Sequence, residues 1–356
     1  MQDQGDEPMM LTDSDDLQDQ LIIEVDKNQS PLRIDSFLNN RIKNVSRTRI
    51  QQGIRAGAIT VDGKNIKPNF KIAPLQTIRV IVPRHEAIDI LPEDLDLDVV
   101  YEDDFLLVVN KPAGMVVHPG LGNPRHTLLN AVAFHLNIDP RDPPEASQDL
   151  ERMGLVHRID KETSGLLVIA KTEYALSHLA KQFYDHTSSR EYLALVWGEP
   201  VPDKGTVDLP IGRHPRFRQL FSAFPERDQG KHAVTHYEVV EKLYYVSLIR
   251  CRLETGRTHQ IRVHMQYLGH PVFHDERYGG DRIVKGTVHT KYKQFVDNLF
   301  KDFPQHALHA KSLGFVHPES GKWMQFDSEL PVEFEVILNK WRKYTSQKKL
   351  TGHGPE

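Results

Sequence analysis

Charge is distributed very unevenly along this chain of 356 residues, and the distribution limits how the chain can fold. Residues 1–30 carry nine acidic side chains and one basic one, whereas residues 31–82 carry ten basic and two acidic side chains. Residues 86–104 then carry nine acidic side chains and no basic one. Blocks of like charge tend to form separate tails, linkers and binding surfaces, and a chain of this length usually forms more than one unit. We therefore expect five segments: an acidic, disordered tail over residues 1–30, a basic domain over 31–82, an acidic linker over 83–98, a main domain over 99–343 and a polar tail over 344–356.

The basic segment has the pattern of two short helices followed by a small sheet. Apolar residues recur at helical spacing over residues 34–42, and Ser46 is suited to cap a second helix. Strands are expected over residues 58–61 and 78–82, with a tight turn at Asp62-Gly63 after the first of them.

This arrangement, together with Ser46-Arg47-Thr48-Arg49 and Val61-Asp62-Gly63-Lys64, resembles the S4 RNA-binding domain. Its excess of basic residues is a suitable electrostatic footprint for RNA phosphates, and a solvated surface without a ligand is the alternative. If the segment binds RNA, we expect Arg47, Arg49 and Arg55 to contact it.

From residue 99 onward, the expected strands and helices intermix without a regular alternation. This pattern indicates an α+β fold with a mixed sheet. Thr127 and Thr172 are suited to cap two helices with apolar stripes, and Thr258 is suited to cap a third that carries Ile261 and Met265.

The single cysteine, Cys251, cannot form a disulfide within the chain and has no partner for a zinc-binding Cys-x-x-Cys pair. A reducing, cytoplasmic environment is therefore expected. The N-terminus has neither the basic start nor the apolar core of a signal peptide, and apolar runs are too short for a membrane span, so we expect no membrane association.

Asp160 ends the stretch Leu155-Val156-His157-Arg158-Ile159-Asp160 and begins a polar loop that leads into an apolar run at Gly165. A polar loop that leads into a buried strand is a usual setting for catalytic groups. A carboxylate in this position could act as a nucleophile, a base or a metal ligand, or it could simply stabilise a turn. From the residue pattern alone these alternatives stay open.

The stretch from Arg257 to His264 places many hydrogen-bond donors at an expected helix start. Such an arrangement suits an anion, because the helix N-terminus and guanidinium groups attract negative charge. An arginine from this stretch could also keep a buried aspartate ionised, since burial alone raises the pKa of a carboxyl group. A solvated helix face is the alternative.

Two other features carry weaker indications. Tyr192 follows Arg190, and an aromatic ring beside a basic residue is able to stack on a base, although a tyrosine of the core is equally expected. The pair His259 and His264 suggests a metal site, but no His-Glu-x-x-His or Cys-x-x-Cys motif accompanies it. Contacts with RNA or hydrogen bonds in the core are expected instead.

Four motifs follow one another along the chain: Asn110-Lys111-Pro112-Ala113-Gly114, His157-Arg158-Ile159-Asp160 with Thr163-Ser164-Gly165, the stretch from Arg252 to His264, and Leu308-His309-Ala310. Together and in this order they resemble the motifs of the RluA family of pseudouridine synthases, and the similarity extends over about residues 33–340. One residue departs from the usual pattern, because Ile159 stands where the family more often has leucine. Residues 281–305 differ from the family pattern and are interpreted as a surface insertion.

The resemblance implies an enzyme that isomerises uridines of large-subunit (23S) ribosomal RNA without a cofactor or metal. It implies that Asp160 is the catalytic residue, that Tyr192 stacks against the uracil and that Arg262 orients Asp160. Arg158 would fill the space left by a flipped uridine. We further expect His157, Arg257 and His259 to contact the RNA, and we expect the protein to be a monomer.

The same residues allow two alternative functions. A ribosome-assembly factor could use the same fold only to bind RNA, and it would not need Asp160, Tyr192 and Arg262 together. A metal-dependent nuclease could use His259 and His264, and its activity would be sensitive to chelators.

Overall fold

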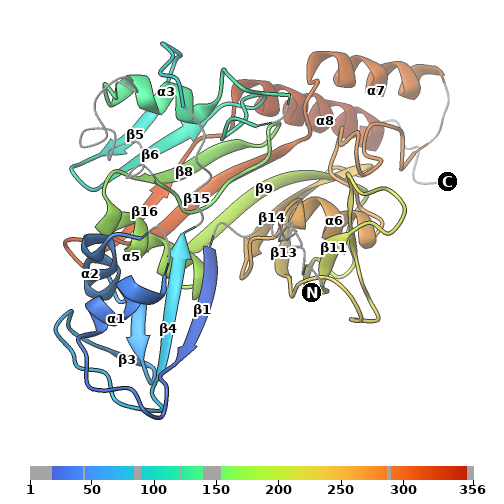
Figure 1. The fold of residues 1–356 in the computed structure, drawn as a ribbon. Helices are drawn as coiled ribbons and strands as arrows, with labels where there is room; N and C mark the ends of the chain where they lie inside the picture. Colours follow the sequence, from blue (N-terminus) through green and yellow to red (C-terminus); the bar gives the residue numbers. More distant parts are fainter. Residues whose placement is uncertain are drawn as a thin grey trace, which may run out of the picture.

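The computed structural model describes residues 18–42, 45–83, 90–120, 122–138, 154–286 and 290–350. Within these ranges it contains two main sheets, one in the basic segment and a larger one in the rest of the chain. Figure 1 shows the basic segment at one end of the molecule, and the last two helices lie at the opposite end.

The basic segment folds around its own apolar core. Helices α1 (Ile34–Arg41) and α2 (Arg47–Arg55) cover a sheet of order β1-β4-β2-β3. The Ser46 side chain caps α2 by accepting a hydrogen bond from the Arg49 amide at 3.2 Å, as expected. The strands are β1 (Gln18–Glu24), β2 (Ile59–Val61), β3 (Lys64–Asn65) and β4 (Thr77–Pro83).

Strand β1 corrects the expectation of a disordered tail over residues 1–30. Its seven residues pair antiparallel with β4, and Val25 immediately after it is buried in the core. The side chains of β1 are largely exposed, so the strand is held mainly by backbone hydrogen bonds to the free edge of β4. Residues 1–17 lie outside the described ranges.

The larger sheet has the order β10-β13-β14-β9-β15-β8-β6-β5, with β16 beside β15 and β7 beside β8. Its pairs are antiparallel except for β15 with β8, which gives the mixed sheet that was expected. Its strands are β5 (Val99–Glu102), β6 (Leu106–Lys111), β7 (Gly154–Leu155), β8 (Ser164–Ala170), β9 (Ser189–Trp197), β10 (Lys204–Asp208), β13 (Val234–Lys242), β14 (Val246–Leu253), β15 (Leu308–Val316) and β16 (Trp323–Asp327). A separate hairpin joins β11 (Ile211–Arg213) to β12 (Phe221–Ala223).

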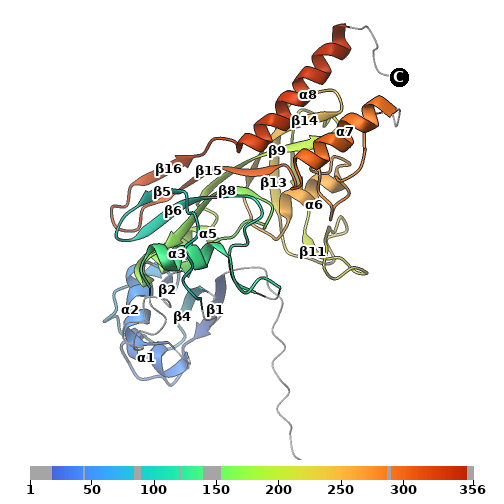
Figure 2. The same ribbon diagram turned by 90° about the horizontal axis from the view of Figure 1, so that it is seen from above.

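Helices cover both faces of this sheet, as Figure 2 shows. Alternate residues of β6 and β8 enter two different cores, because successive side chains of a strand point to opposite faces. One core includes α3 (Leu128–His135) and α6 (Gln260–Tyr267), and the other includes α5 (Glu173–Tyr184). Thr127 and Thr172 are the N-cap residues of α3 and α5, as expected. Thr172 accepts from the Ala175 amide, whereas the amide and hydroxyl of Thr127 donate to the Asn130 side chain.

The last two helices correct two expectations about the C-terminal part of the chain. Helix α7 (Thr290–Asp302) was interpreted as part of a surface insertion, but its Tyr292, Val296 and Leu299 are buried in a core with Trp341. Helix α8 (Val332–Leu350) extends into the segment 344–356 that was expected to be a tail, and residues 351–356 lie outside the described ranges. Its Thr345 is buried and donates a hydrogen bond to the Leu243 carbonyl at 3.1 Å, so the chain stays packed beyond residue 343.

The start of α6 also differs from the expectation. The N-cap is His259 rather than Thr258, and it has left-handed backbone dihedrals, with φ of 56°. Its side chain makes no capping hydrogen bond and is directed to other partners. In the described part of the chain, no helix is both long and apolar enough to cross a membrane.

The basic segment packs directly against the main domain. Helix α2 and strand β4 lie beside α5, with ion pairs between Arg49 and Glu173 at 3.2 Å and between Arg79 and Asp185 at 3.2 Å. The Gln18 side chain of β1 donates to the Val156 carbonyl at 2.6 Å. Arg49, which was expected to contact RNA, is therefore engaged at the interface between the two units.

We predict that Gly165→Ala destabilises the protein strongly. Gly165 has a φ of 115°, and an added Cβ would lie 2.3 Å from the Ala310 carbonyl oxygen on the neighbouring strand β15. The backbone strain alone costs on the order of 1–3 kcal/mol, and the clash adds to it. The free energy of unfolding from chemical denaturation measures the effect.

The matched control for this prediction is Gly321→Ala. Gly321 also has a positive φ, of 64°, but no atom lies within 4 Å of an added Cβ. The Gly321→Ala variant should lose only the stability that the positive φ costs, because its added Cβ meets no other atom. Equal losses of stability in the two variants would contradict the close packing of β8 against β15.

Candidate active site

The site is a cavity of about 350 Å³ between the Asp160 loop, β9, the end of α5 and the start of α6. Asp160, Tyr192 and Arg262, which the sequence places far apart, all line it. So do His157, Arg158, Arg257 and His259. The sequence therefore predicted a set of residues that the fold brings together.

Asp160 is held by a short ion pair. Its Oδ2 lies 2.7 Å from Arg262 Nη1 and 3.8 Å from His259 Nε2. Burial alone would raise the pKa of the Asp160 carboxyl, but nearby His259 and Arg262 outweigh burial and hold the pKa well below its usual range. Burial also lowers the pKa of His259 to about 4, so this ring is neutral near pH 7. Arg262 is therefore the charge that keeps Asp160 ionised at neutral pH.

Arg262 is itself fixed by a second carboxylate. Asp275, whose side chain is fully buried, accepts from Arg262 Nε at 2.6 Å and from Nη2 at 2.9 Å. The Asp275 carboxylate also accepts from the backbone amides of Arg277 and Tyr278. Burial alone would lower the pKa of Arg262, but its hydrogen bonds to Asp275 and the charge of Asp160 raise it. One guanidinium thus bridges two carboxylates, and only its Nη1 is directed to the cavity.

Sequence reasoning missed Asp275. It lies 13 positions after Arg262, directly after His274 and before Glu276 and Arg277, and nothing in the pattern separates it from an exposed loop aspartate. The two histidines before it, His270 and His274, make internal hydrogen bonds: His270 bonds to the Trp197 carbonyl and His274 to the Phe303 carbonyl.

Tyr192 forms one wall of the cavity. It lies on β9, is 8% exposed, and its pKa is raised mainly by burial. The phenol is therefore protonated at neutral pH. A flat, mostly buried ring beside a carboxylate suits the stacking of a planar group.

The histidines near Asp160 are mostly committed to internal contacts. His157 stacks on Phe183 with ring centroids 4.6 Å apart, and its Nε2 accepts from the Val168 amide at 3.1 Å. His259 Nδ1 lies 2.7 Å from the Tyr278 hydroxyl. Burial lowers the pKa of His157 to about 3, so neither ring carries a charge at neutral pH. The contacts of His157 and His259 with a ligand stay predictions.

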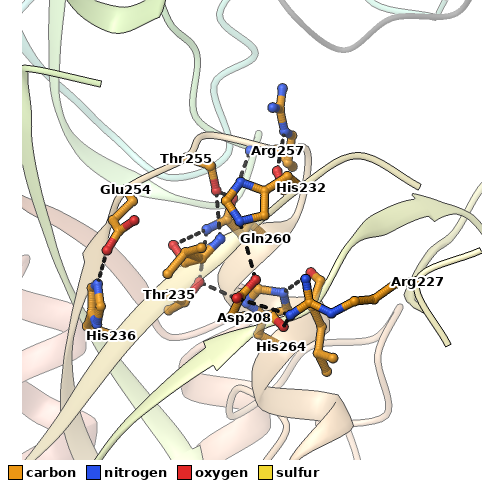
Figure 3. Close-up of polar contacts among 12 residues, drawn as sticks. Asp208, Arg227, His232, Thr235, His236, Glu254, Thr255, Arg257, Gln260 and His264 are labelled. Carbon is orange, nitrogen blue, oxygen red and sulfur yellow. Dashed lines mark hydrogen bonds and ion pairs between the residues drawn. The ribbon is translucent and has the colours of Figure 1, made fainter. Parts of the chain in front are cut away.

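A polar network fixes the chain just before α6 (Figure 3). The Gln260 side chain accepts from the Arg257 amide at 3.0 Å and from Thr255 Oγ1 at 2.7 Å. Its amide group donates to the Val234 carbonyl and to Thr235 Oγ1, both at 2.9 Å. Because Gln260 is buried and all its polar atoms are used, the network anchors the loop that carries Arg257 to strand β13.

His264 belongs to the same network rather than to a pair with His259. Its Nδ1 lies 2.9 Å from Thr235 Oγ1 and its Nε2 lies 3.0 Å from the Leu209 carbonyl oxygen. Among the described residues, no group of three or more His, Cys, Asp or Glu side chains is placed to hold a metal ion. The geometry gives no support to a site built on His259 and His264.

The three arginines expected on the basic domain lie on α2, outside the cavity. Arg47 pairs with the buried Asp35 at 3.0 Å, and Arg49 pairs with Glu173. Arg55 is exposed. A role in RNA binding stays a prediction for all three, and the geometry favours it most for Arg55.

Comparison with known proteins gives consistent matches over most of the chain. A family model described as RNA pseudouridylate synthase matches residues 105–267, and an S4 domain model matches residues 32–77. An uncharacterized RNA pseudouridine synthase of Chlorobaculum parvum is 42% identical over 90% of this chain and 98% of its own. The ribosomal large subunit pseudouridine synthase D of Zymomonas mobilis is 42% identical over 86% of this chain and 92% of its own.

Among solved structures, human RNA Pseudouridylate Synthase Domain Containing 4 has a TM-score of 0.53 and 24% identity. The match covers 69% of this chain and 93% of that one. At this level of identity the likeness bears on the fold, and it agrees with the mixed α+β architecture described above.

We predict that Arg262→Gln raises the pKa of Asp160 by about one to three pH units, because burial then acts on the carboxyl without the guanidinium that pairs with it. Titration of the ¹³C-labelled aspartate carboxyl by NMR measures this pKa. The control Arg342→Gln removes an arginine on α8 that pairs with Glu241. An Asp160 pKa that is the same in the Arg262 variant and the wild type would contradict the role of this ion pair.

Proposed function

The chain belongs to the RNA pseudouridylate synthase family and carries an S4 domain, and from this premise we propose that it isomerises specific uridines of 23S ribosomal RNA, with Asp160 as the catalytic residue. The family resemblance expected from the sequence motifs is thereby confirmed, and the activity is that of an isomerase acting on RNA. One observation carries the proposal for Asp160: it is the carboxylate that Arg262 holds ionised within the cavity.

The proposed reaction begins with a uridine that leaves its stack and enters the cavity, which costs a few kcal/mol. Arg158 is exposed beside the cavity and would occupy the space that the base vacates. Ionised Asp160 then acts at the ribose, either by attacking C1′ or by removing the 2′ proton. The N1–C1′ bond breaks, the uracil rotates, and a C5–C1′ bond forms.

The step balances without another reactant. C5 loses a proton and N1 gains one, so the product is an isomer of the substrate and nothing is oxidised or reduced. Arg262 would orient Asp160 throughout, because its other nitrogens are fixed on Asp275. Tyr192 would stack against the uracil. Burial raises the pKa of Tyr192, so its phenol is protonated when the reaction begins and does not serve as the first base. Another group must therefore accept the C5 proton.

Ribosomal RNA is the proposed substrate because relatives with about 40% identity are named ribosomal large subunit pseudouridine synthase D. The S4 domain would contribute electrostatic affinity for this RNA, and His157, Arg257 and His259 would contact the nucleotide near Asp160. We propose that the protein acts in the cytoplasm, because its single cysteine forms no disulfide and suits a reducing compartment. We also propose that it acts as a monomer.

We predict that Asp160→Asn lowers the rate of pseudouridine formation by on the order of 10³-fold or more. Arg262 keeps its pair with Asp275 in this variant, so the fold should persist and RNA binding should change little. Mapping of pseudouridine in 23S ribosomal RNA from cells with the wild-type protein, with the variant and without the protein gives the readout.

The matched control is Asp297→Asn, which removes an exposed carboxylate on α7. Normal modification by Asp160→Asn would refute the catalytic assignment and would favour a binding role. Complete modification in cells without the protein would refute ribosomal RNA as the substrate.

We predict that RNA affinity depends less steeply on salt when exposed basic residues of the S4 domain are neutralised. Each phosphate contact contributes about 0.7 to 0.9 to the slope of log K against log salt concentration, so a fourfold variant should reduce the slope by up to about three. Binding titrations over a range of salt concentrations measure it. The substituted residues, each changed to Gln, are Arg55, Lys64, Lys67 and Lys71.

The control neutralises exposed lysines at the opposite end of the molecule, on α7 and α8. It makes the same change of net charge away from the S4 domain. Equal slopes in the two variants would contradict the docking role of the domain. The control residues, each changed to Gln, are Lys291, Lys293, Lys301 and Lys343.

A further inference from the structure

Arg190 is a buried cation for which the mechanism above has no use. It lies on β9, two residues before Tyr192, and is 7% exposed. Its Nε is buried without a hydrogen-bond partner, and its Nη2 makes one long hydrogen bond, of 3.4 Å, to the Glu254 carbonyl. Among the described residues, no carboxylate forms an ion pair with it.

Two other buried or half-buried arginines near the sheet, unlike Arg190, form ion pairs with carboxylates. Arg262 has Asp160 and Asp275, and Arg250 has Glu191 at 2.9 Å. A buried ion without a partner destabilises the folded chain, and arginine cannot avoid that penalty by losing its proton. Contact with the Phe183 ring, 5.4 Å from the guanidinium carbon, compensates only part of it. The Arg190 guanidinium therefore has hydrogen-bond donors available to bind an anion from outside the chain.

The position of Arg190 indicates which anion this is. Arg190 lines the same cavity as Asp160 and Tyr192. Among the described residues that line this cavity, Asp160 is the one acidic side chain, and the arginines are Arg158, Arg190, Arg257 and Arg262. Such an excess of positive charge suits a ligand that brings negative charge with it. A uracil is neutral, whereas each nucleotide in RNA carries a phosphate.

The local backbone leaves room for this guanidinium. A Cβ at Gly256 would lie 2.5 Å from Arg190 Nη1, so the absence of a side chain at residue 256 lets the guanidinium lie against that loop. Arg190 and Tyr192 project from the same side of β9, and two residues of a strand span about 7 Å. This spacing is comparable to the separation of a base from the phosphates of its own nucleotide.

We propose that Arg190 binds a phosphate that flanks the target uridine, so that the base reaches Tyr192 while its backbone is held on the neighbouring side chain. The proposal rests on the proposed function, because it assumes that a flipped nucleotide enters this cavity. It gives Arg190 a role in binding the substrate, separate from the positioning of Asp160 by Arg262.

The test combines Arg190→Gln with a change in the RNA. The probe is a stem-loop that carries a uridine mapped as a target, with a methylphosphonate at either the 5′ or the 3′ flanking phosphate. With the wild-type enzyme, one of the two substitutions should raise KM roughly 10- to 100-fold, as expected for a hydrogen bond between charged groups. With Arg190→Gln, KM for unmodified RNA should rise by a similar factor, and the same methylphosphonate should cause little further loss.

A structural role for Arg190, through its packing on Phe183, gives a different result. In that case the methylphosphonate would weaken binding by the same factor in the wild type and in Arg190→Gln, and this outcome would overturn the proposal. Arg190→Lys supplies a second variant, since a lysine keeps the charge and should restore much of the lost affinity and the sensitivity to the methylphosphonate. Arg342→Gln is the control for loss of one positive charge far from the cavity.

The possible failures are distinguishable. If the wild-type enzyme forms no pseudouridine in any ribosomal RNA, the proposed function fails, and the assignment of Arg190 fails with it. If it modifies the unaltered stem-loop but neither methylphosphonate raises KM, only the assignment of Arg190 is refuted. Should Arg190→Gln not fold, the comparison of the wild type with Arg190→Lys on the three RNAs still decides the question.

Discussion

The ion pair between Asp160 and Arg262 depends on a third group, Asp275, and the rest of the site is arranged around this three-membered unit. A single arginine next to a single buried aspartate would be free to rotate away or to exchange its partner for solvent. Asp275 prevents this by holding two nitrogens of the guanidinium, and backbone amides hold Asp275 in turn. The backbone amides thus fix Asp275, Asp275 fixes the guanidinium of Arg262, and Arg262 fixes the orientation of the Asp160 carboxylate.

Sequence reasoning identified the elements whose patterns are local. The caps at Ser46, Thr127 and Thr172, the strands with continuous apolar runs and the four ordered motifs all depend on neighbours within a few positions. The reasoning failed where long-range contacts decide the structure. Strand β1 has mostly exposed side chains and exists because β4 offers it an edge, and the burial of α7 depends on Trp341, some 40 residues later.

The same distinction applies to the site. Asp160, Tyr192 and Arg262 were predicted from a resemblance in motifs, and the structure brings them to one cavity. Asp275 had no such signal. The sequence shows how many basic residues the domain has, but not how many of them are available to bind RNA. Arg47 and Arg49, for example, form ion pairs with Asp35 and Glu173. A count of basic residues overstates the number of phosphates that a domain contacts, because some of the cations hold the protein together.

The place of β15 in the larger sheet has a consequence for the order in which the protein forms during synthesis. This strand lies between β8 and β9, although both precede it by more than a hundred residues. The S4 domain uses only residues up to Pro83 for its sheet and can form as soon as that part of the chain leaves the ribosome. Strands β8 and β9, by contrast, are joined within the larger sheet only when β15, which ends at Val316 and supplies Leu308 to the cavity, has been made. A nascent chain would therefore acquire an RNA-binding surface well before it acquires a working cavity.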